Sequence, residues 1–127
     1  MLGNFQKSHL RIELDAPQTA IRDSLLNSEQ LQSWLWTQRF QAGLPEQLFP
    51  GLIFTTWAGP VAIQHQVEVA KSNCLRLILS QGIDGYHEWY WGEGWVQSCL
   101  EGVSLLPLNW GQTLSLLQLR QFLTAKK

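Results

Sequence analysis

The chain has 127 residues, of which 45% are hydrophobic and 15% are charged, and its formal net charge at pH 7 is −1. This length and apolar content suffice for a buried core and argue against a disordered chain. Its nine Lys and Arg residues are scattered singly apart from the terminal pair Lys126–Lys127, which excludes the basic surface that nucleic-acid binding requires. We expect a single domain over residues 1–127 with no nucleic-acid partner.

From the sequence we expect neither a membrane span nor a signal peptide. No apolar run approaches the roughly 18 residues that a membrane span needs, and the opening MLGNFQKSHL lacks the basic and apolar regions of a signal peptide. Cys74 and Cys99 are too far apart for a CxxC motif and are expected to be separate buried thiols. These features predict a cytoplasmic protein without a membrane span.

The first predicted element is a strand over residues 9–15, HLRIELD, in which apolar and polar side chains alternate. Leu10, Ile12 and Leu14 share one face, and the polar residues between them share the other. Such alternation is typical of a strand with one face on a core and one in water.

Two short helices are predicted next. Asp15 is expected to cap the first, because a carboxylate accepts hydrogen bonds from the free N–H groups at a helix start. Residues 27–28, Asn-Ser, are expected to end this helix and cap the second. There Leu31, Trp34 and Leu35 have the i, i+3, i+4 spacing of a helix with one buried face.

The middle of the chain predicts about five strands in succession. Residues 51–59, 61–70 and 74–82 are rich in apolar side chains and separated by short turn signals, and the segments 86–92 and 94–102 meet at a Gly-Glu-Gly turn. Connections this short require antiparallel neighbours, because a parallel pair needs a crossover of a dozen or more residues.

A long helix is predicted at the C-terminal end. Asn109 is expected to cap it, and Trp110, Leu114 and Leu117 are expected to form its buried face. Further apolar residues widen this arc, which indicates a helix held on more than one side: Leu116, Leu119, Phe122 and Leu123. The predicted fold class is therefore α+β, a curved antiparallel sheet of about six strands gripping the C-terminal helix, with two short helices after the first strand.

Four segments in this order carry a family resemblance: DAP (15–17), SEQLQSWLW (28–36), DGYHEWYWG (84–92) and LLQLRQFL (116–123). With them the chain resembles the START-like helix-grip superfamily, SRPBCC, which includes START lipid-transfer domains, plant pollen-allergen-type proteins, polyketide cyclases and chaperone-activator domains. The resemblance implies a cavity between the concave sheet and the C-terminal helix, which in this superfamily often holds an apolar ligand. It carries over no catalytic residues.

Aromatic side chains cluster within residues 86–95. Strand alternation places His87, Trp89 and Trp91 on one face, and the two indoles make this the expected inner face. Three interpretations stay open: rings that fill a core, rings that line a ligand cavity, and an exposed platform for a sugar or a protein partner.

His65 interrupts an otherwise aliphatic row, since alternation puts it on the same face as Val61, Ile63, Val67 and Val69. Such a histidine is either a neutral core residue bonded to a backbone carbonyl or a polar anchor for the head of an apolar ligand.

Other chemistry finds no support in the sequence. HEWYW (87–91) resembles the start of a zinc-protease motif, but Trp91 stands where the second His is required and the segment predicts a strand. Neither Cys74 nor Cys99 has the surroundings that activate a thiol. We therefore predict no metal, no cofactor and no catalytic residue.

These patterns predict a protein that binds a small hydrophobic molecule, such as a lipid, an isoprenoid or a pigment-like compound, between the sheet and the C-terminal helix. The expected ligand-binding residues are Trp34, Trp57, His65, Trp89, Trp91, Trp110, Leu114 and Leu117. Two alternatives remain. One is a cyclase- or hydrolase-like enzyme with His65 as its acid or base, and the other is an accessory protein that binds a protein partner through Trp36.

Overall fold

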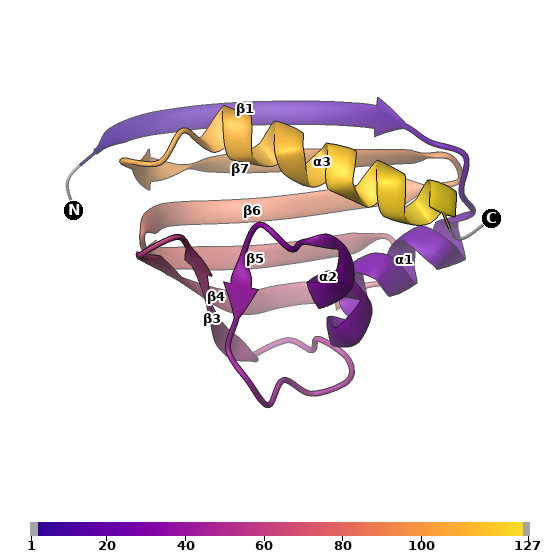
Figure 1. Ribbon diagram of the computed structural model, residues 1–127, viewed down its shortest axis with the longest axis horizontal. Coiled ribbons are helices and arrows are strands. Elements are labelled where there is room, and N and C mark those ends of the chain that lie inside the picture. The colour runs from indigo at the N-terminus through magenta and orange to yellow at the C-terminus, as the bar shows by residue number, and fades with distance from the viewer. Residues whose placement is uncertain (1–2, 126–127) are drawn as a thin grey trace.

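The computed structural model describes residues 3–125, which form one seven-stranded antiparallel sheet and three helices (Figure 1). The strands are β1 (Asn4–Glu13), β2 (Arg39–Phe40), β3 (Ile53–Ala58), β4 (Val61–Lys71), β5 (Cys74–Gln81), β6 (Ile83–Gly92) and β7 (Trp95–Ser104). The helices are α1 (Gln18–Leu26), α2 (Ser28–Trp34) and α3 (Leu108–Ala125). The predicted α+β class is confirmed, including the two short helices and the long C-terminal one.

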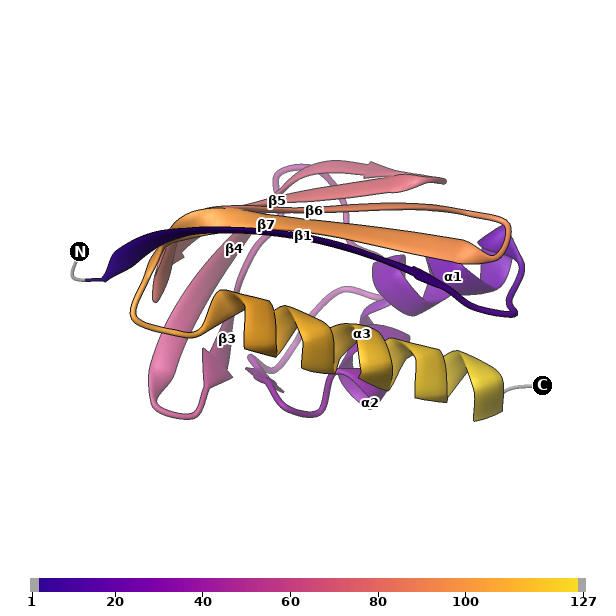
Figure 2. The same cartoon turned by 90° about the horizontal axis from the view of Figure 1, so that it is seen from above.

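The sheet is curved, and all three helices lie on its concave side (Figure 2). Its strand order is β1-β7-β6-β5-β4-β3-β2, so the first strand pairs with the last and the sheet stays open between β1 and β2. Helix α3 contacts β1 and β7 at one side of the sheet, whereas α1 and α2 pack beside one another and against α3. None of the helices within residues 3–125 has the length and hydropathy to cross a membrane.

Strand β2 is the element that the sequence pattern missed. It consists of Arg39 and Phe40, which pair with Trp57 and Thr56 of β3. A strand of two residues is too short to show an alternation of apolar and polar side chains. Its presence raises the sheet from about six strands to seven.

The alternation predicted for the first strand is confirmed, and the strand begins earlier, at Asn4. Leu10 and Ile12 lie opposite Ser98 and Val96 of β7, both of which are fully buried. Residues directly opposite each other across an antiparallel pair lie on the same face. This face is therefore the concave, core-facing side of β1.

The predicted cap of α1 is wrong. Pro17, and not Asp15, occupies the cap position, and it supplies no side-chain hydrogen bond. The first N–H of the helix, that of Gln18, instead donates to Oε1 of Glu93 at 3.0 Å. Glu93 lies in the turn between β6 and β7, so a carboxylate distant in sequence accepts the hydrogen bond of this first N–H.

The predicted start of α2 is confirmed. The side chain of Asn27 accepts a hydrogen bond from the backbone N–H of Gln30 at 2.9 Å. Leu31, Trp34 and Leu35 are all buried, as their spacing indicated.

The row of side chains around His65 is confirmed up to Val67 but not at Val69. A bulge between these two valines shifts the register, so Val67 lies opposite Leu77 and Val69 lies opposite Arg76. Arg76 belongs to the outer face, where it forms ion pairs with neighbouring carboxylates. The bulge therefore turns Val69 to the outer face, because an extra residue reverses the alternation beyond it.

The predicted buried face of α3 is wrong for Trp110, Leu114 and Leu117, whereas Leu116, Leu119 and Leu123 of the wider apolar arc are buried. Trp110 is 64% exposed, Leu117 is 51% exposed and Leu114 is only half-buried. The helix begins at Leu108, so Asn109 lies inside it rather than capping it. The face turned to the sheet consists of Leu108, Gln112, Ser115, Leu116, Gln118, Leu119 and Leu123.

Hydrogen bonds explain why polar residues occupy the inner face of α3. The backbone N–H of Leu108 donates to Oε1 of Gln6 on β1 at 3.0 Å. The side chain of Gln112 bonds to both β1 and β7. A buried amide is tolerated where its hydrogen bonds are met, and these bonds fix the rotation of the helix.

No helix within residues 3–125 covers the outer face of the sheet (Figure 2). Charged and aromatic side chains lie on this face. Arg76 contacts Glu68 and Glu88 at 2.7 Å each and lies over the ring of Tyr86. Cys74 is half-buried beside this group; Cys99 is buried, and both thiols are free. Partly exposed ion pairs of this kind contribute little to stability.

The orientation of α3 can be tested by two truncations. Leu119 is fully buried, so Leu119→Ala is expected to lower the free energy of unfolding by about 2–5 kcal/mol. Leu117 is 51% exposed, so Leu117→Ala serves as the matched control and is expected to cost less than about 1 kcal/mol. Urea unfolding of the two variants measures both values. Equal losses would contradict the observed face.

Candidate functional site

A cavity of about 230 Å³ lies between the N-terminal half of α3 and the concave face of the sheet. We call it the main cavity. Its wall is mostly apolar and includes Ile63, Leu79, Ile83, Leu100 and Leu108. Three solvent-exposed residues line one end, where the cavity reaches the surface: Pro107, Trp110 and Gly111.

A smaller space of about 50 Å³ lies between the two short helices and the sheet. We call it the inner recess. Leu25 of α1, Leu31 of α2 and Trp89 of β6 are among the apolar residues that line it. The inner recess and the main cavity share four polar lining residues: Gln38, His65, His87 and Ser115. The two spaces therefore adjoin at the histidines.

His65 on β4 is 8% exposed and is held on two sides. Its Nε2 lies 2.9 Å from the hydroxyl of Thr56, and its ring stacks on Phe54 with 4.8 Å between centroids. Its other nitrogen, Nδ1, has no hydrogen-bond partner within residues 3–125. His65 thus brings a fixed ring with one unused polar atom to the wall of both spaces.

His87 on β6 lies on the same concave face. Its Nε2 lies 2.7 Å from the hydroxyl of Ser98, and its ring is 4.7 Å from that of Trp89. Because Ser98 Oγ also accepts a hydrogen bond from Gln112, its own hydrogen is available for Nε2 of His87. We therefore assign the ring hydrogen of neutral His87 to Nδ1.

Gln112 of α3 is the hub of the polar groups behind the cavity wall. Its Nε2 donates to the carbonyl of Ser8 at 3.1 Å and to the carbonyl and hydroxyl of Ser98 at 2.9 Å each. Its Oε1 accepts the hydroxyl of Ser8 at 2.5 Å. Asn109 donates to that same hydroxyl at 2.8 Å. These bonds join the helix to both β1 and β7.

Burial keeps both histidines neutral. It lowers the pKa of His65 to about 4. It lowers the pKa of His87 to about 3, and the nearby His65 adds to that shift. Desolvation disfavours the charged form of an imidazole, which explains the direction. At neutral pH the two rings are therefore uncharged donors and acceptors.

The site contains no charged wall and no metal cluster among the described residues. None of the residues that line either space is Lys, Arg, Asp or Glu. Within residues 3–125, no three His, Cys, Asp or Glu side chains come together in a way that could hold a metal ion. The polar groups at the site are imidazole, amide and hydroxyl groups.

Sequence comparison finds no match, whereas comparison of structures finds chains with a similar fold. No protein-family model matches the chain, and no curated protein sequence matches it significantly. Protein CV1439 from Chromobacterium violaceum has a similar structure, with 17% identity, a TM-score of 0.73 and coverage of 92% of this chain and 96% of that one.

Two further solved structures match over most of their length. Major latex-like protein 151 from Panax ginseng has 8% identity and a TM-score of 0.68, with 98% of both chains covered. The Aha1 dimer from Colwellia psychrerythraea has 15% identity and a TM-score of 0.67, with 93% of this chain and 96% of that one covered. The chain has the helix-grip fold. The predicted resemblance is therefore confirmed for the architecture.

Within this helix-grip fold, three of the residues expected to bind a ligand line the two spaces. His65 lines both of them, Trp89 lines the inner recess, and Trp110 lines the mouth of the main cavity. His65 comes from β4 and Trp89 from β6, with β5 between them, whereas Trp110 comes from α3.

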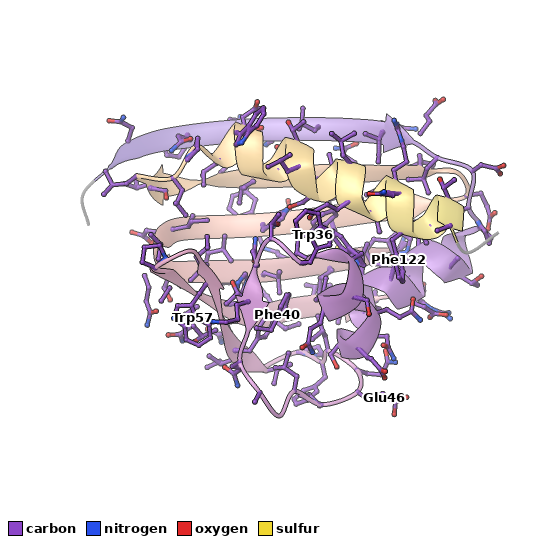
Figure 3. The ribbon with its side chains drawn as sticks, in the orientation of Figure 1. Trp36, Phe40, Glu46, Trp57 and Phe122 are labelled. Carbon is purple, nitrogen blue, oxygen red and sulfur yellow. The ribbon has the colours of Figure 1, made fainter. Side chains whose placement is uncertain are left out.

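The other expected residues lie elsewhere. Trp34 and Trp91 are 2% exposed and line neither space. Trp57 belongs to the outer face of β3, where Arg39 lies over its ring, and Figure 3 shows it far from α3. Leu114 lines neither space, and Leu117 lies over a shallow surface hollow against β1.

The aromatic segment of β6 therefore contributes both to the packed core and to the wall beside it. Trp34 and Trp89 meet edge to face at 6.2 Å, and the Trp34 indole donates to the carbonyl of Ser24. These rings and Trp91 fill the core at one end of the sheet. On the same face, His87 lies at the border between this packed core and the main cavity.

Several residues of the site were missed by the sequence prediction. His87 could have been found, because alternation puts it on the face of Trp89. Across β5 it lies level with Val67, the next residue after His65 on the same face of β4. Gln112 and Ser115 had no such signal, since polar residues on a helix normally indicate its exposed side. Thr56 and Ser98 are small hydroxyl residues inside strands and carry no distinguishing pattern.

Lowering the pH should destabilise the fold through these histidines. An unfolded histidine has a pKa of about 6.5, whereas the pKa of folded His65 is about 4. Between these values the unfolded chain binds more protons, so the free energy of unfolding must fall as the pH falls. From pH 7 to pH 5 we expect His65 to contribute a loss of about 1–2 kcal/mol.

His65→Phe provides the comparison for this prediction. The variant should lose stability less steeply than the wild type over the same range, as measured by urea unfolding at pH 7, 6 and 5. His9→Phe, on the outer face of β1, is the control, since His9 lines neither space. Parallel pH profiles for the wild type and His65→Phe would show that His65 is not held neutral by burial.

Proposed function

We propose that the protein binds a small hydrophobic molecule in the main cavity. The observation that carries this proposal is an apolar cavity of about 230 Å³ whose lining includes the buried imidazole of His65. Ligand sites are typically concave, mostly apolar and supplied with a few placed polar groups. The location is also the one that the helix-grip resemblance implied.

The cavity has an entrance suited to an apolar molecule. Trp110, Pro107 and Gly111 are exposed and line its outer end. An indole that is 64% exposed leaves much of its apolar surface in water. A ligand that passes this point could cover part of that surface, which would favour binding.

An enzyme in the same cavity is the second candidate, because the imidazole of His65 is among the side chains that line the cavity. Its chemistry would be restricted. A general acid or base works best with a pKa near the working pH, whereas burial lowers the pKa of His65 to about 4. His65 would therefore be a weak base at neutral pH, which makes binding the better-supported function.

Recognition of a protein partner is a third candidate and rests on Trp36, which is 69% exposed. In the view of Figure 3, Trp36 lies between α2 and α3, and the adjacent Thr37 donates a hydrogen bond to Gln118 of α3. Single exposed apolar residues are common on soluble proteins. The exposed Trp36 side chain is therefore compatible with a protein partner but names none.

Trp110→Ala distinguishes a cavity mouth from a packed core. Because the side chain is 64% exposed, we expect the free energy of unfolding to fall by less than about 1 kcal/mol. We also expect weaker binding of naphthalene, which serves as an apolar probe, in a calorimetric titration. A loss of about 3–5 kcal/mol, as for a buried Trp, would contradict the position of α3.

Trp36→Ala is the matched control, because Trp36 is equally exposed but lines neither space. It should leave naphthalene binding unchanged. Native mass spectrometry of freshly purified protein, followed by organic extraction, tests for a co-purifying compound. The proposal fails if no compound co-purifies and the wild type does not bind naphthalene.

A further inference from the structure

Four polar side chains line both spaces and therefore lie where these adjoin: Gln38, His65, His87 and Ser115. Nδ1 of His65 is fully buried, so it faces neither space although it has no partner within residues 3–125. The hydroxyl of Ser115 donates to a backbone carbonyl of its own helix, which leaves only its lone pairs. Gln112, which lines the main cavity alone, uses its amide hydrogens on β1 and β7. A hydrogen-bond donor for a ligand must therefore come from His87 or Gln38.

His87 presents its Nδ1 to the two spaces. The ring lies on the concave face and lines both of them, and the residue is only half-buried. Within residues 3–125, the fully buried side-chain atoms without a partner are Nδ1 of His65 and Nε1 of Trp91, and not Nδ1 of His87. Because Nδ1 of His87 also lacks a partner among these residues, it must keep accessible surface, and on this face that surface opens into the cavity.

The bonds behind the wall fix which nitrogen of His87 carries the hydrogen. The carbonyls of Ser8 and Ser98 only accept, so the amide of Gln112 must turn its Nε2 toward them. That Nε2 also donates to the hydroxyl of Ser98, whose own hydrogen has Nε2 of His87, at 2.7 Å, as its acceptor. Ser98 is fully buried, so the opposite tautomer would leave its hydrogen unpaired. Nδ1 of His87 is therefore an N–H group that points a hydrogen bond at the cavity.

Gln38 adds a second polar group whose direction is not fixed. It lies in the segment between α2 and β2, which crosses the concave side of the sheet (Figure 2), and it is half-buried. Its side chain has no hydrogen bond within residues 3–125. An amide carries both donors and an acceptor, so Gln38 can turn either end toward a ligand that His87 has oriented.

A carbonyl oxygen is the ligand group that suits this pair. It needs only donors, and its two lone pairs can accept from Nδ1 of His87 and from the amide of Gln38. A hydroxyl oxygen can accept the same bond from His87, but its own hydrogen then needs an acceptor as well. A group that only donates would meet the N–H of His87 with like polarity.

The size and charge of the two spaces limit the rest of the ligand. An engineered apolar cavity of about 150 Å³ binds benzene, and pockets for drug-sized ligands are about 300–1,000 Å³. The main cavity, at about 230 Å³, lies between these values, which leaves room for one or two fused rings. None of the described residues that line either space is Lys, Arg, Asp or Glu, so a charged ligand would be buried without an opposite charge.

We infer that the ligand is a compact, uncharged ring compound with a carbonyl group, such as a bicyclic ketone, whose oxygen accepts a hydrogen bond from Nδ1 of His87, with Gln38 as its second polar contact. This inference rests on the proposed function and narrows it. It disfavours fatty acids and long isoprenoids, which the sequence alone left open.

Three bicyclic probes of similar size test the inference by calorimetry at pH 7.5: indane is apolar, 1-indanone adds a carbonyl, and indole offers only a donor. Each probe is compared between the wild type and His87→Phe, so the different solubilities of the probes in water cancel. One neutral hydrogen bond corresponds to about a three- to tenfold change in affinity. We expect His87→Phe to weaken 1-indanone binding by this factor and to leave indane and indole within about twofold.

The variants carry their own controls. Indane binding by His87→Phe shows that its cavity has formed. If His87→Phe does not fold, His87→Phe with Ser98→Ala, which also removes the hydroxyl left without an acceptor, takes its place. His9→Phe, on the outer face of β1, should bind all three probes as the wild type does. Gln38→Met keeps the length of the side chain without its amide and should weaken 1-indanone but not indane.

The direction of the hydrogen bond can be measured without a ligand. In protein labelled with ¹⁵N-histidine, nitrogen NMR distinguishes the ring nitrogen that carries a hydrogen from the one that does not. At pH 7.5 we expect Nδ1 of His87 to carry it. A hydrogen on Nε2 instead would overturn the assignment of His87 as the donor.

The outcomes separate this inference from the function beneath it. If His87→Phe binds 1-indanone as the wild type does, or loses indane to the same extent, the carbonyl contact is wrong while apolar binding by the wild type stands. If indole loses as much as 1-indanone, Nδ1 of His87 does not act as a donor. If Gln38→Met binds 1-indanone unchanged, Gln38 is not the second contact. If neither naphthalene nor any of the three probes binds to the wild type, the proposed function itself fails.

Discussion

The position of α3 depends on the buried amide of Gln112. This one side chain bonds to backbone carbonyls of β1 and β7 and to hydroxyls of both strands. Because β1 is an edge strand and β7 is its neighbour, the N-terminal half of the helix is tied to one side of the sheet. The concave surface of β4, β5 and β6 is therefore not covered by the helix at this end, and the main cavity occupies that space.

The opposite end of the same surface is filled. Leu116, Leu119 and Leu123 of α3 are buried in the core that also includes α1 and α2. Trp34 and Trp89 close this end with an edge-to-face contact at 6.2 Å, a geometry that adds to the stabilisation from burial. The aromatic segment of β6 thus passes from packed core to cavity wall along one strand. The concave face is therefore packed with side chains at one end of the sheet and borders the main cavity at the other.

The sequence correctly predicted those features that follow from local residue patterns. Alternation in β1 and β6, the Asn27 cap and the stripe of α2 were all correct, because each is a local pattern. Trp110, Leu114 and Leu117 were wrongly assigned to the buried face of α3, since large apolar residues occur all around that helix. The hydrogen bonds to β1 that help to set its rotation reach about 100 positions back along the chain. His65 was found because it interrupts an apolar row. Gln112, which determines where the cavity lies, could not be distinguished from a surface glutamine.

An unpaired buried atom does not by itself mark a binding site. Nε1 of Trp91 also lacks a partner within the described residues, yet Trp91 lines neither space. For Trp91 the unmet hydrogen bond is offset by the burial of a large apolar ring. His65 is smaller and more polar than Trp91, so burial of its ring offsets less of the cost of an unmet hydrogen bond. A leucine at this position would fit the same aliphatic row and leave no donor or acceptor unpaired. What distinguishes His65 is that its ring lines both spaces, so a molecule held there would pack against the buried imidazole and stabilise the folded chain.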